Sequence, residues 1–373
     1  MIEIIEVKTN KQLKEFVLFP NKLYWDCEYY VPMINIDEIN NLKPSKNPAF
    51  EECDVVLYLA KKDGKTVGRI GGIIQNTYNK LNNCKKVRFT RFDSINDQEV
   101  ANALFDKVTE WAKAKGMTEI VGPLGFNDLE REGLLIEGFD RLSTYETQYS
   151  YDYYPKLIEN YGFSKDIDWV ESRLKVPKNV DERYERIAKR VLDKYNLRIV
   201  KGLSKKQLIK QDGDPIFDLI DEGYKDLYGT VPYTTKTRQL ILKNFNLALN
   251  IDLITLVVDE NNNAVAFALI LPSLSEAVRD SHGNLFPTGA FKMLKAIKKP
   301  KVADFALVTI AKQYQNQGLN SIIFVELIRN MNKLGITECE TNLNLEDNYA
   351  IQNMWHNFER EQHKRRRSYI KKI

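Results

Sequence analysis

The alternation of apolar and polar residues along the chain predicts two similar runs of secondary structure. Residues 54–75 read as a strand, an Asp-Gly turn and a second strand, which is the strongest short-range signal for a hairpin. Residues 252–271 follow the same plan, with an Asn-rich turn in place of Asp63 and Gly64. Each hairpin is followed, after an insertion, by a third strand and a long amphipathic helix. The sequence therefore contains an internal repeat.

The third strand and the long helix have the same spacing in both halves. In the first half we expect the strand at residues 87–92 and the helix at residues 97–115, which has apolar residues at helical intervals. In the second half we expect them at residues 303–310 and about 319–334. The recurrence of this order makes duplication the better explanation of the pattern.

Both long helices stop at a glycine and are followed by the same elements. Gly116 and Gly335 stand where a helix most easily ends in a left-handed turn. The elements that follow are a strand, a short helix at residues 153–158 or 348–357, and a last strand at residues 169–176 or 367–372. Each half is thus expected to finish on its own last strand.

Two copies of β-β-β-α-β-α-β predict an α/β fold of two domains, with duplicated mixed β-sheets flanked by helices. We expect the linker at residues 177–179, before a charged helix at residues 181–195. The predicted domains are residues 1–177 and residues 178–373. The length of 373 residues agrees with two domains.

Composition and charge exclude several classes of protein. With 43% hydrophobic and 28% charged residues, the chain is neither disordered nor fibrous. The net charge of +4 gives no reason to expect a nucleic-acid surface. The basic run at residues 363–367 is read as the solvated face of an edge strand rather than as an RNA contact. No run approaches the ~20 apolar residues needed to cross a bilayer, so we expect a soluble cytoplasmic protein with no membrane partner.

The cysteines and histidines indicate neither disulfides nor a metal. The four cysteines lie far apart, which suits reduced thiols, and the three histidines lack the spacing of metal ligands. No nucleophile elbow, Walker loop or dinucleotide-binding glycine motif is present in the sequence. The hydrolase, nucleotide triphosphatase and dinucleotide interpretations therefore have no motif to support them.

One strand-to-helix junction has the features of a phosphate site. The strand that ends near Ile310 runs into a polar turn, and the helix begins near Gly318. A helix N-terminus presents unpaired N–H groups and partial positive charge, and a glycine lets a phosphate approach the backbone. Residues 305–325 contain no Asp or Glu. The matching first-half turn at residues 94–99 has acidic residues and no glycine, so we expect it to bind no phosphate.

At this junction the chain resembles a known superfamily. Gln315-x-x-Gly318-x-Asn320 is similar to the Gln/Arg-x-x-Gly-x-Gly/Ala acyl-CoA pyrophosphate loop of the GNAT N-acetyltransferases. Residues 348–358 resemble the helix that follows in that superfamily, and residues 161–163 resemble the end of its motif. Further segments resemble an uncharacterised bacterial group of tandem GNAT proteins: residues 47–50, 67–70, 122–123, 132–140 and 345–348.

The resemblance implies that the C-terminal domain binds acetyl-CoA or another acyl-CoA, and that the N-terminal domain has no CoA loop. The residues that it implies for the cosubstrate site are Val308, Thr309, Ile310, Gln315, Asn316, Gln317, Gly318, Leu319, Asn320, Ser321 and Asn348. The position that often holds a general-acid tyrosine is filled by Met354 or Trp355. The resemblance therefore supports CoA binding more strongly than it supports acetyl transfer.

Two residues are candidates for the chemistry. Acyl transfer to an amine needs a base for the ammonium proton and an acid for the thiolate. By resemblance to the tandem group, Glu340 is the candidate base, and the alternative is a salt-bridged strand glutamate. Tyr233, on a loop after a helix, is the candidate acid, and the alternative is a packing role. Asp304 is a weaker candidate base.

The expected function is an acyl-CoA-dependent N-acyltransferase that acetylates a small-molecule or peptide amine. The alternatives are a protein that binds acyl-CoA without turnover and an interaction protein that keeps the fold. The segment 122–149 is long and rich in turn residues. We expect it to form part of the acceptor pocket over the cleft between the domains, or else to pack one domain against the other.

Overall fold

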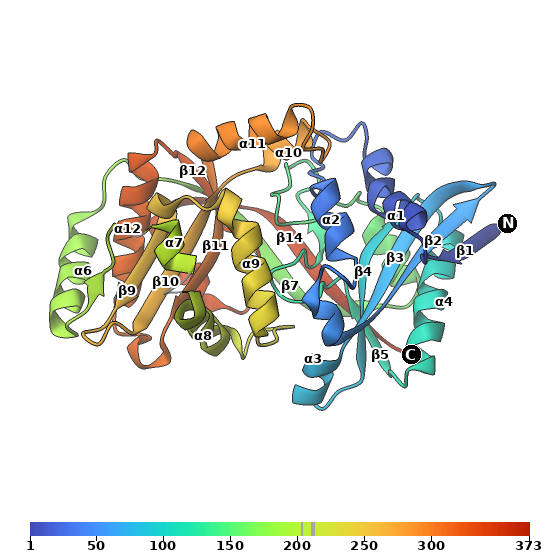
Figure 1. Ribbon diagram of the computed structural model, residues 1–373, viewed down its shortest axis with the longest axis horizontal. Helices are drawn as coiled ribbons and strands as arrows, with labels where there is room; N and C mark the ends of the chain where they lie inside the picture. The colour runs from blue at the N-terminus through green and yellow to red at the C-terminus, as the bar shows by residue number, and fades with distance from the viewer. Residues whose placement is uncertain (203, 210–212) are drawn as a thin grey trace. The chain divides into compact units, whose positions relative to one another are not determined.

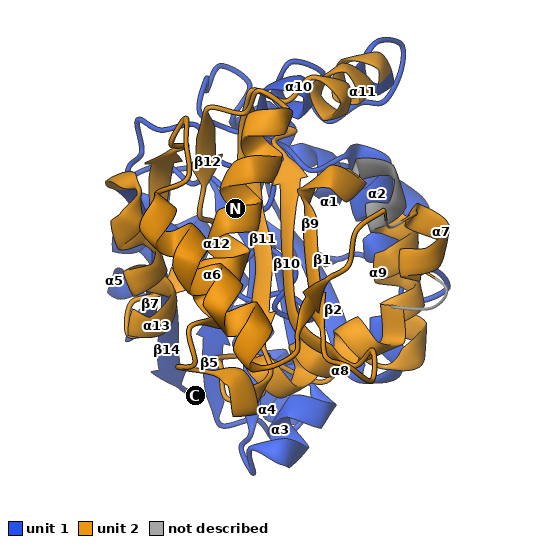
Figure 2. Ribbon diagram, turned by 90° about the vertical axis from the view of Figure 1, so that its left-hand side faces the viewer, with its two compact units in different colours: residues 1–170, 275–290, 363–373 blue, residues 171–274, 291–362 orange. Residues whose placement is uncertain are grey.

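The computed structural model describes residues 1–202, 204–209 and 213–373 (Figure 1). Its contacts divide the chain into two compact units, coloured separately in Figure 2. Unit 1 contains residues 1–170, 275–290 and 363–373, and unit 2 contains residues 171–274 and 291–362. The division of the repeat at residue 177 stays a prediction, because the units are not continuous in sequence.

Unit 1 is built on a mixed sheet in which β4 and β5 run parallel. Its strands follow one another in this order: β1 (Ile2–Glu6), β2 (Cys53–Lys62), β3 (Lys65–Gln75), β4 (Lys86–Ser94), β5 (Glu119–Gly122) and the end of β14 (Glu359–Lys372), which also pairs with β6 (Leu134–Glu137). Its helices are α1 (Asn10–Leu23), α2 (Asn35–Asn41), α3 (Asn76–Leu81), α4 (Gln98–Ala114), α5 (Tyr154–Asn160) and α10 (Ser275–Arg279). On the predicted apolar face of α4, Val100, Leu104 and Val108 are buried in the core and Trp111 is partly buried against it.

Unit 2 repeats this plan, with β11 and β12 as its parallel pair. Its strands follow in the order β7 (Ser164–Lys175), β12 (Glu338–Glu340), β11 (Val302–Ile310), β10 (Ala264–Pro272), β9 (Ile254–Val258) and β8 (Arg198–Ile199), and β13 (Asn344–Leu345) is short. Its helices are α6 (Glu182–Lys194), α7 (Lys205–Gln207), α8 (Gly213–Tyr224), α9 (Thr235–Ala248), α11 (Gly289–Lys298), α12 (Leu319–Lys333) and α13 (Tyr349–Met354). The helices α6 and α12 lie side by side in Figures 1 and 2.

The predicted ends of the long helices are confirmed. Gly116 follows α4 with a φ of 78°, and Gly335 follows α12 with a φ of 72°. Both values lie in the left-handed region, which a residue without a Cβ adopts at little cost. The duplicated α/β fold predicted from the sequence is therefore the fold of the chain.

The last strands differ from the prediction, because each completes the sheet of the other half. Residues 173–175 of β7 pair with β12, whereas residues 369–372 of β14 pair with β5. Both strands are longer than predicted, at 12 and 14 residues, and the boundary between the units falls inside each of them. The added length carries each strand from one unit into the other.

In both units the parallel pair of strands separates early. In unit 2, β11 pairs with β12 only at residues 302–304, and β11 then continues to Ile310. In unit 1, β4 pairs with β5 only at residues 86–88 and continues to Ser94. Each separation exposes a strand edge, and the candidate sites lie at these two places. None of the described helices is long and apolar enough to cross a bilayer.

Candidate functional site

The predicted phosphate loop of unit 2 joins β11 to the N-terminus of α12. Gly318 is the N-cap residue of α12 and has a φ of 85°, a conformation that L side chains rarely adopt. Among the described residues no side chain caps this helix end, and its first turn contains no acidic residue. Gln315 folds back so that its Nε2 donates to the carbonyl oxygen of Ile310 at 3.1 Å. The exposed loop therefore leaves backbone N–H groups and the positive end of the helix dipole open to an anion.

Helix α6 lies beside this loop and adds positive charge to it. A Cβ placed on Gly318 lies 3.2 Å from a methyl group of Val191 in α6. At the end of α6, Lys194 Nζ donates to the hydroxyl of Tyr195 at 2.8 Å, and that hydroxyl donates to Gln317 Oε1 at 2.6 Å. A lysine is thus connected to the loop through two hydrogen bonds.

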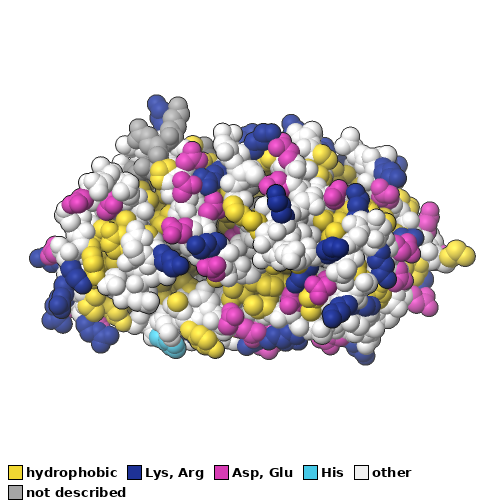
Figure 3. All heavy atoms as spheres, turned by 90° about the horizontal axis from the view of Figure 1, so that it is seen from below, with side chains coloured by type: hydrophobic (Ala, Val, Ile, Leu, Met, Phe, Trp, Pro, Cys, Tyr) yellow, Lys and Arg dark blue, Asp and Glu magenta, His cyan; other side chains and the backbone are white. Residues whose placement is uncertain are grey.

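The same helix carries a row of exposed cations. They lie at intervals of three and four residues, and this spacing places them on one side of a helix: Arg183, Arg186, Arg190 and Lys194. Figure 3 shows Lys and Arg side chains gathered at the end of unit 2 where α6 lies. The sequence analysis used this segment only to place the linker, although the spacing of its cations was readable.

The exposed edge of β11 is occupied by a tyrosine of α8. The Tyr224 hydroxyl donates to the carbonyl oxygen of Val308 at 3.0 Å and accepts from the Val308 N–H at 3.2 Å. Next to it, Thr309 Oγ1 donates to the carbonyl oxygen of Leu219 at 3.2 Å. A Cβ on Gly223 lies only 2.2 Å from Thr309 Oγ1, so only glycine allows α8 to approach β11 this closely. Tyr224 is not among the residues predicted from the sequence, whereas Tyr233 of the following loop is.

Glu340 lies where β11 and β12 separate. It is 6% exposed and stands opposite Asp304 of β11 and Arg173 of β7. Its Oε1 is 3.8 Å from Arg173 Nη1, whereas Arg173 Nε donates to Glu338 at 3.0 Å. Burial raises the pKa of the neighbouring Cys339 thiol well above its usual value, and the carboxylates of Asp304 and Glu340 raise it further. Glu340 is therefore a buried carboxylate with a long contact to a shared cation.

The remaining predicted residues lie on other elements of unit 2. Tyr233 is buried on the loop after α8, with its ring edge-on to Phe217 at 5.6 Å between centroids. Asn348 caps α13 by accepting from the N–H of Ile351 at 3.3 Å. The catalytic role of Tyr233 and the cosubstrate role of Asn348 stay predictions.

Unit 1 has a different arrangement at the matching positions. Asp97 caps α4 by accepting from the N–H of Glu99 at 3.0 Å, and it also pairs with Lys62 at 3.0 Å. The positive end of this helix is therefore satisfied within the protein.

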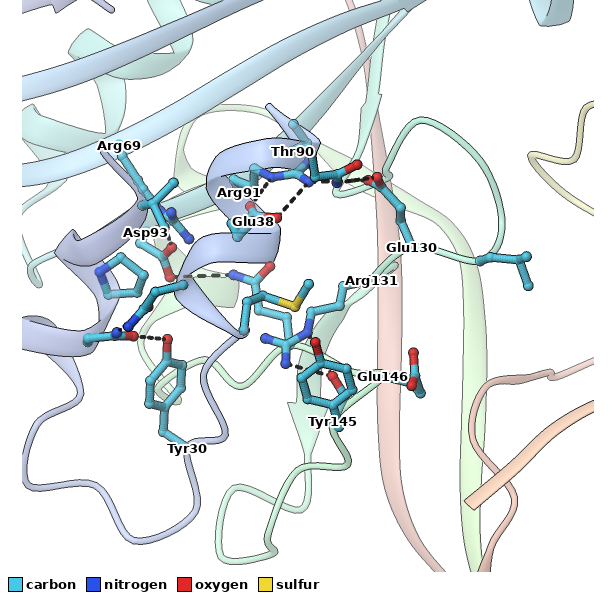
Figure 4. Close-up of a pocket in the computed structure, with 18 residues that line it drawn as sticks. Tyr30, Glu38, Arg69, Thr90, Arg91, Asp93, Glu130, Arg131, Tyr145 and Glu146 are labelled. Atoms are coloured by element: carbon cyan, nitrogen blue, oxygen red, sulfur yellow. Dashed lines mark hydrogen bonds and ion pairs between the residues drawn. The ribbon is translucent and has the colours of Figure 1, made fainter. Parts of the chain in front are cut away.

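Where β4 leaves β5, unit 1 instead contains a cavity of about 100 Å³ (Figure 4). Its charged lining consists of three guanidinium groups and four carboxylates: Arg69, Arg91, Arg131, Glu38, Asp93, Glu130 and Glu146. Part of the lining comes from the segment 122–149, which was expected to contribute to an acceptor pocket. That role stays a prediction.

Most of these charges have partners. Arg69 pairs with Asp93 at 2.8 Å, and Arg91 pairs with both Glu38 at 2.5 Å and Glu130 at 3.3 Å. Arg91 is thus shared between two carboxylates. With three guanidinium groups and four carboxylates, the lining has one excess negative charge when every group is ionised.

Arg131 and Glu146 stand apart from these pairs. Arg131 donates to backbone carbonyl oxygens, including that of Tyr145 at 2.7 Å. The Glu146 carboxylate has no hydrogen bond or ion pair within the described part of the chain. Burial raises the pKa of Glu146, and the Arg131 charge only partly opposes this shift. Glu146 is therefore a buried carboxyl, inside a polar cavity, whose protonated form is favoured by its surroundings.

Comparisons with known proteins agree with this architecture. No family model matches the chain. It is 28% identical to Protein YghO of Escherichia coli K12, over 97% of this chain and 93% of that protein. It is 26% identical to the bacterial ceramide synthase of Caulobacter vibrioides, over 84% and 82% of the two chains.

Among solved structures, a tandem GNAT protein from the clavulanic acid biosynthesis pathway superposes with a TM-score of 0.57. The superposition covers 100% of this chain and 98% of that chain, at 10% sequence identity. The resemblance noted in the sequence is thus confirmed at the level of the fold, which is a tandem GNAT fold.

Proposed function

We propose that the chain is a cytoplasmic acyl-CoA-dependent N-acyltransferase whose donor nucleotide binds at residues 315–321 of unit 2. The observation that carries this proposal is the uncapped N-terminus of α12, with a lysine hydrogen-bonded to its loop through Tyr195. The pyrophosphate of CoA accepts hydrogen bonds from such N–H groups, and the cations on α6 suit its further phosphate.

The edge of β11 suits the rest of the donor. Beyond residue 304 this edge is no longer paired with β12, and Val308 directs its N–H and carbonyl oxygen to a single hydroxyl. The amide groups of a pantetheine arm form the same two hydrogen bonds once Tyr224 moves aside. The thioester then lies towards Glu340, at the point where the strands separate.

The proposed chemistry is direct transfer. The neutral amine attacks the thioester carbon, the C–S bond breaks, and CoA leaves as the thiolate. Glu340, itself or through a water molecule, takes the proton that the amine loses, and Tyr233 supplies a proton to the thiolate. The position of Glu340, at the point where β11 and β12 separate, favours this role.

The class of acceptor is suggested by a relative. Ceramides are amides of fatty acids with long-chain amino alcohols, and one relative is named a ceramide synthase. This name supports an amine acceptor and makes longer acyl-CoAs candidate donors beside acetyl-CoA.

Thermal unfolding with CoA, acetyl-CoA and palmitoyl-CoA tests donor binding. A ligand at 100 times its Kd adds ~2.7 kcal/mol to the free energy of unfolding. Gly318→Glu should abolish the shift, because it places a carboxylate where the phosphates bind. Gly335→Glu is the matched control, since Gly335 lies at the other end of α12 and also has a positive φ. The donor site is wrong if both variants respond alike, or if no ligand shifts the unfolding temperature of the wild type.

Release of free thiol separates the enzyme from its alternative. Transfer to an amine leaves CoA with a thiol group that reacts with a chromogenic disulfide. If CoA binds at residues 315–321 but no panel of amino alcohols, amino acids or peptides releases thiol, the protein binds acyl-CoA without turnover.

A second candidate function rests on the cavity of unit 1, which we propose binds a compact amine. Its excess carboxylate charge and the unpaired Glu146 both favour an ammonium group. Calorimetry with ethanolamine, serinol and propanol tests this function. Binding of the two amines and not of propanol supports it, and equal heats with all three contradict it.

A further inference from the structure

Helix α11 (Gly289–Lys298) exposes an unusual set of side chains. Phe291 is 72% exposed and Leu294 is 50% exposed, and Phe286 in the preceding turn is 83% exposed. Nine large apolar side chains are exposed among the described residues, and three of them fall within nine residues of the sequence. Scattered exposed apolar residues are ordinary on a protein surface, but such a group indicates a surface that binds something.

The exposed face of α11 also carries positive charge. Lys295 and Lys298 follow Phe291 at intervals of four and seven residues, so they lie on its side of the helix. Both lysines are exposed, and neither forms an ion pair within the described residues. The opposite side of the helix is anchored in the protein by the buried Met293.

The surrounding sequence contains no opposite charge. No Asp or Glu occurs from residue 281 to residue 303, whereas five lysines do: Lys292, Lys295, Lys298, Lys299 and Lys301. A protein partner that bound by apolar contact alone would not need this surplus of positive charge. Aromatic and aliphatic side chains between lysines on one helix face suit the boundary of an anionic bilayer, where apolar groups enter the acyl region and ammonium groups meet phosphates.

We propose that α11 docks this protein on the surface of a membrane that contains anionic lipids. The helix lies in the plane of the interface, since its ten residues are too few to span a bilayer. Phe291 and Leu294 enter the lipid, and the lysines contact headgroup phosphates. The docking is independent of the acyl-transfer proposal, because none of these residues belongs to the donor loop or to the cavity of unit 1.

Sedimentation with vesicles tests the proposal on the full chain. We expect the protein to pellet with vesicles of phosphatidylcholine and phosphatidylglycerol and to stay in solution with phosphatidylcholine alone. Because the attraction to headgroups is partly electrostatic, binding should weaken as salt is raised. Equal partition into both vesicle types, or none into either, overturns the proposal.

Two double variants place the binding surface. Phe291→Ser with Leu294→Ser removes the apolar part, and Lys295→Glu with Lys298→Glu reverses the charge. Each should lower the vesicle partition coefficient by about tenfold or more. Lys80→Glu with Leu81→Ser on α3 is the matched control, since both of those side chains are also exposed. Binding that survives the α11 changes, or that is lost equally in the control, contradicts the assignment.

The alternative partner of the exposed face of α11 is a second copy of the chain. Sedimentation velocity without lipid distinguishes it: a dimer that dissociates on Phe291→Ser with Leu294→Ser means that α11 binds itself, and the membrane proposal is then wrong. A monomer whose mass is unchanged by the substitutions supports the lipid assignment. Unfolding temperatures of all variants establish that each remains folded.

Discussion

The hydroxyl of Tyr224 is hydrogen-bonded to both backbone polar groups of Val308, as acceptor at 3.2 Å and as donor at 3.0 Å. Val308 belongs to the stretch of β11 that extends beyond its pairing with β12. Its N–H and carbonyl oxygen therefore have a side chain as partner where a sheet would supply a strand. Buried backbone groups need such a partner, and a ligand that contains amides can replace it.

Tyr224→Phe should separate stability from ligand binding. Loss of the hydroxyl should lower the free energy of unfolding by ~1 kcal/mol, because Val308 loses its partner. The affinity for acyl-CoA should rise severalfold, since the donor no longer displaces a hydrogen bond. Urea unfolding and calorimetry measure the two effects. A fall in affinity means that the hydroxyl contributes to the bound state instead.

Lys194→Glu should weaken CoA binding in a manner that depends on salt. The change reverses a charge that is hydrogen-bonded through Tyr195 to the loop, and the loss should be about tenfold at low ionic strength. Titration at low and high salt measures it, and the difference from wild type should shrink as salt is added. Lys189→Glu, exposed on the side of α6 away from Gly318, is the control and should have a smaller effect.

Glu146→Gln should change the pH dependence of stability. Burial raises the pKa of Glu146 in the folded protein above its value in the unfolded chain. The protonated carboxyl is thus the form that folding favours, and this contribution is lost as pH rises through the folded pKa. The glutamine variant should unfold at a higher temperature than wild type near neutral pH, and the two should converge in acid below the ordinary glutamate pKa.

The same substitution bears on the amine proposal for unit 1. Glu146→Gln should abolish any rise of amine affinity with pH that comes from ionisation of this carboxyl. Glu110→Gln, which changes an exposed carboxylate of α4, serves as the control for both measurements. If the difference in unfolding temperature between Glu146→Gln and wild type is the same at every pH, the pKa of Glu146 is not raised by burial and the prediction is wrong.

Removal of residues 363–373 should unfold unit 1, although they lie at the far end of the sequence. These residues pair with β5 and β6, and they bury Lys364, Arg366 and Tyr369. Deletion of residues 1–6 is the control, because β1 is an edge strand that pairs only with β2. Limited proteolysis followed by mass spectrometry should find new cuts throughout residues 1–170 in the first variant only. If residues 1–170 resist proteolysis in both variants, the end of β14 is not needed for the folding of unit 1.

The sequence was informative where structure depends on local rules. The hairpins, the long helices and the terminating glycines Gly116 and Gly335 follow from side-chain alternation, helical spacing and the freedom of a residue without a Cβ. The loop before α12 was recognisable because a glycine, a polar turn and an absence of acids stand next to one another in the chain.

Features that depend on distant contacts were not predictable in this way. Nothing in the spacing of Tyr224 indicates that α8 meets β11, and Gly223, whose missing Cβ permits the approach, is an ordinary glycine in sequence. The cavity of unit 1 collects residues from separate elements, so its charge balance exists only in the folded chain. The exchange of β7 and β14 also escaped prediction, because either strand has the alternation needed for either sheet.

The exchange of last strands has a consequence for how the protein is made. Residues 1–170 are synthesised before residues 363–373, so the first unit lacks its final strand until those residues have been made. During that interval the free edge of β5 is open to other chains, as unpaired strand edges are in general. A stop in synthesis before residue 363 therefore harms the N-terminal unit first, because that unit is left with an open sheet edge.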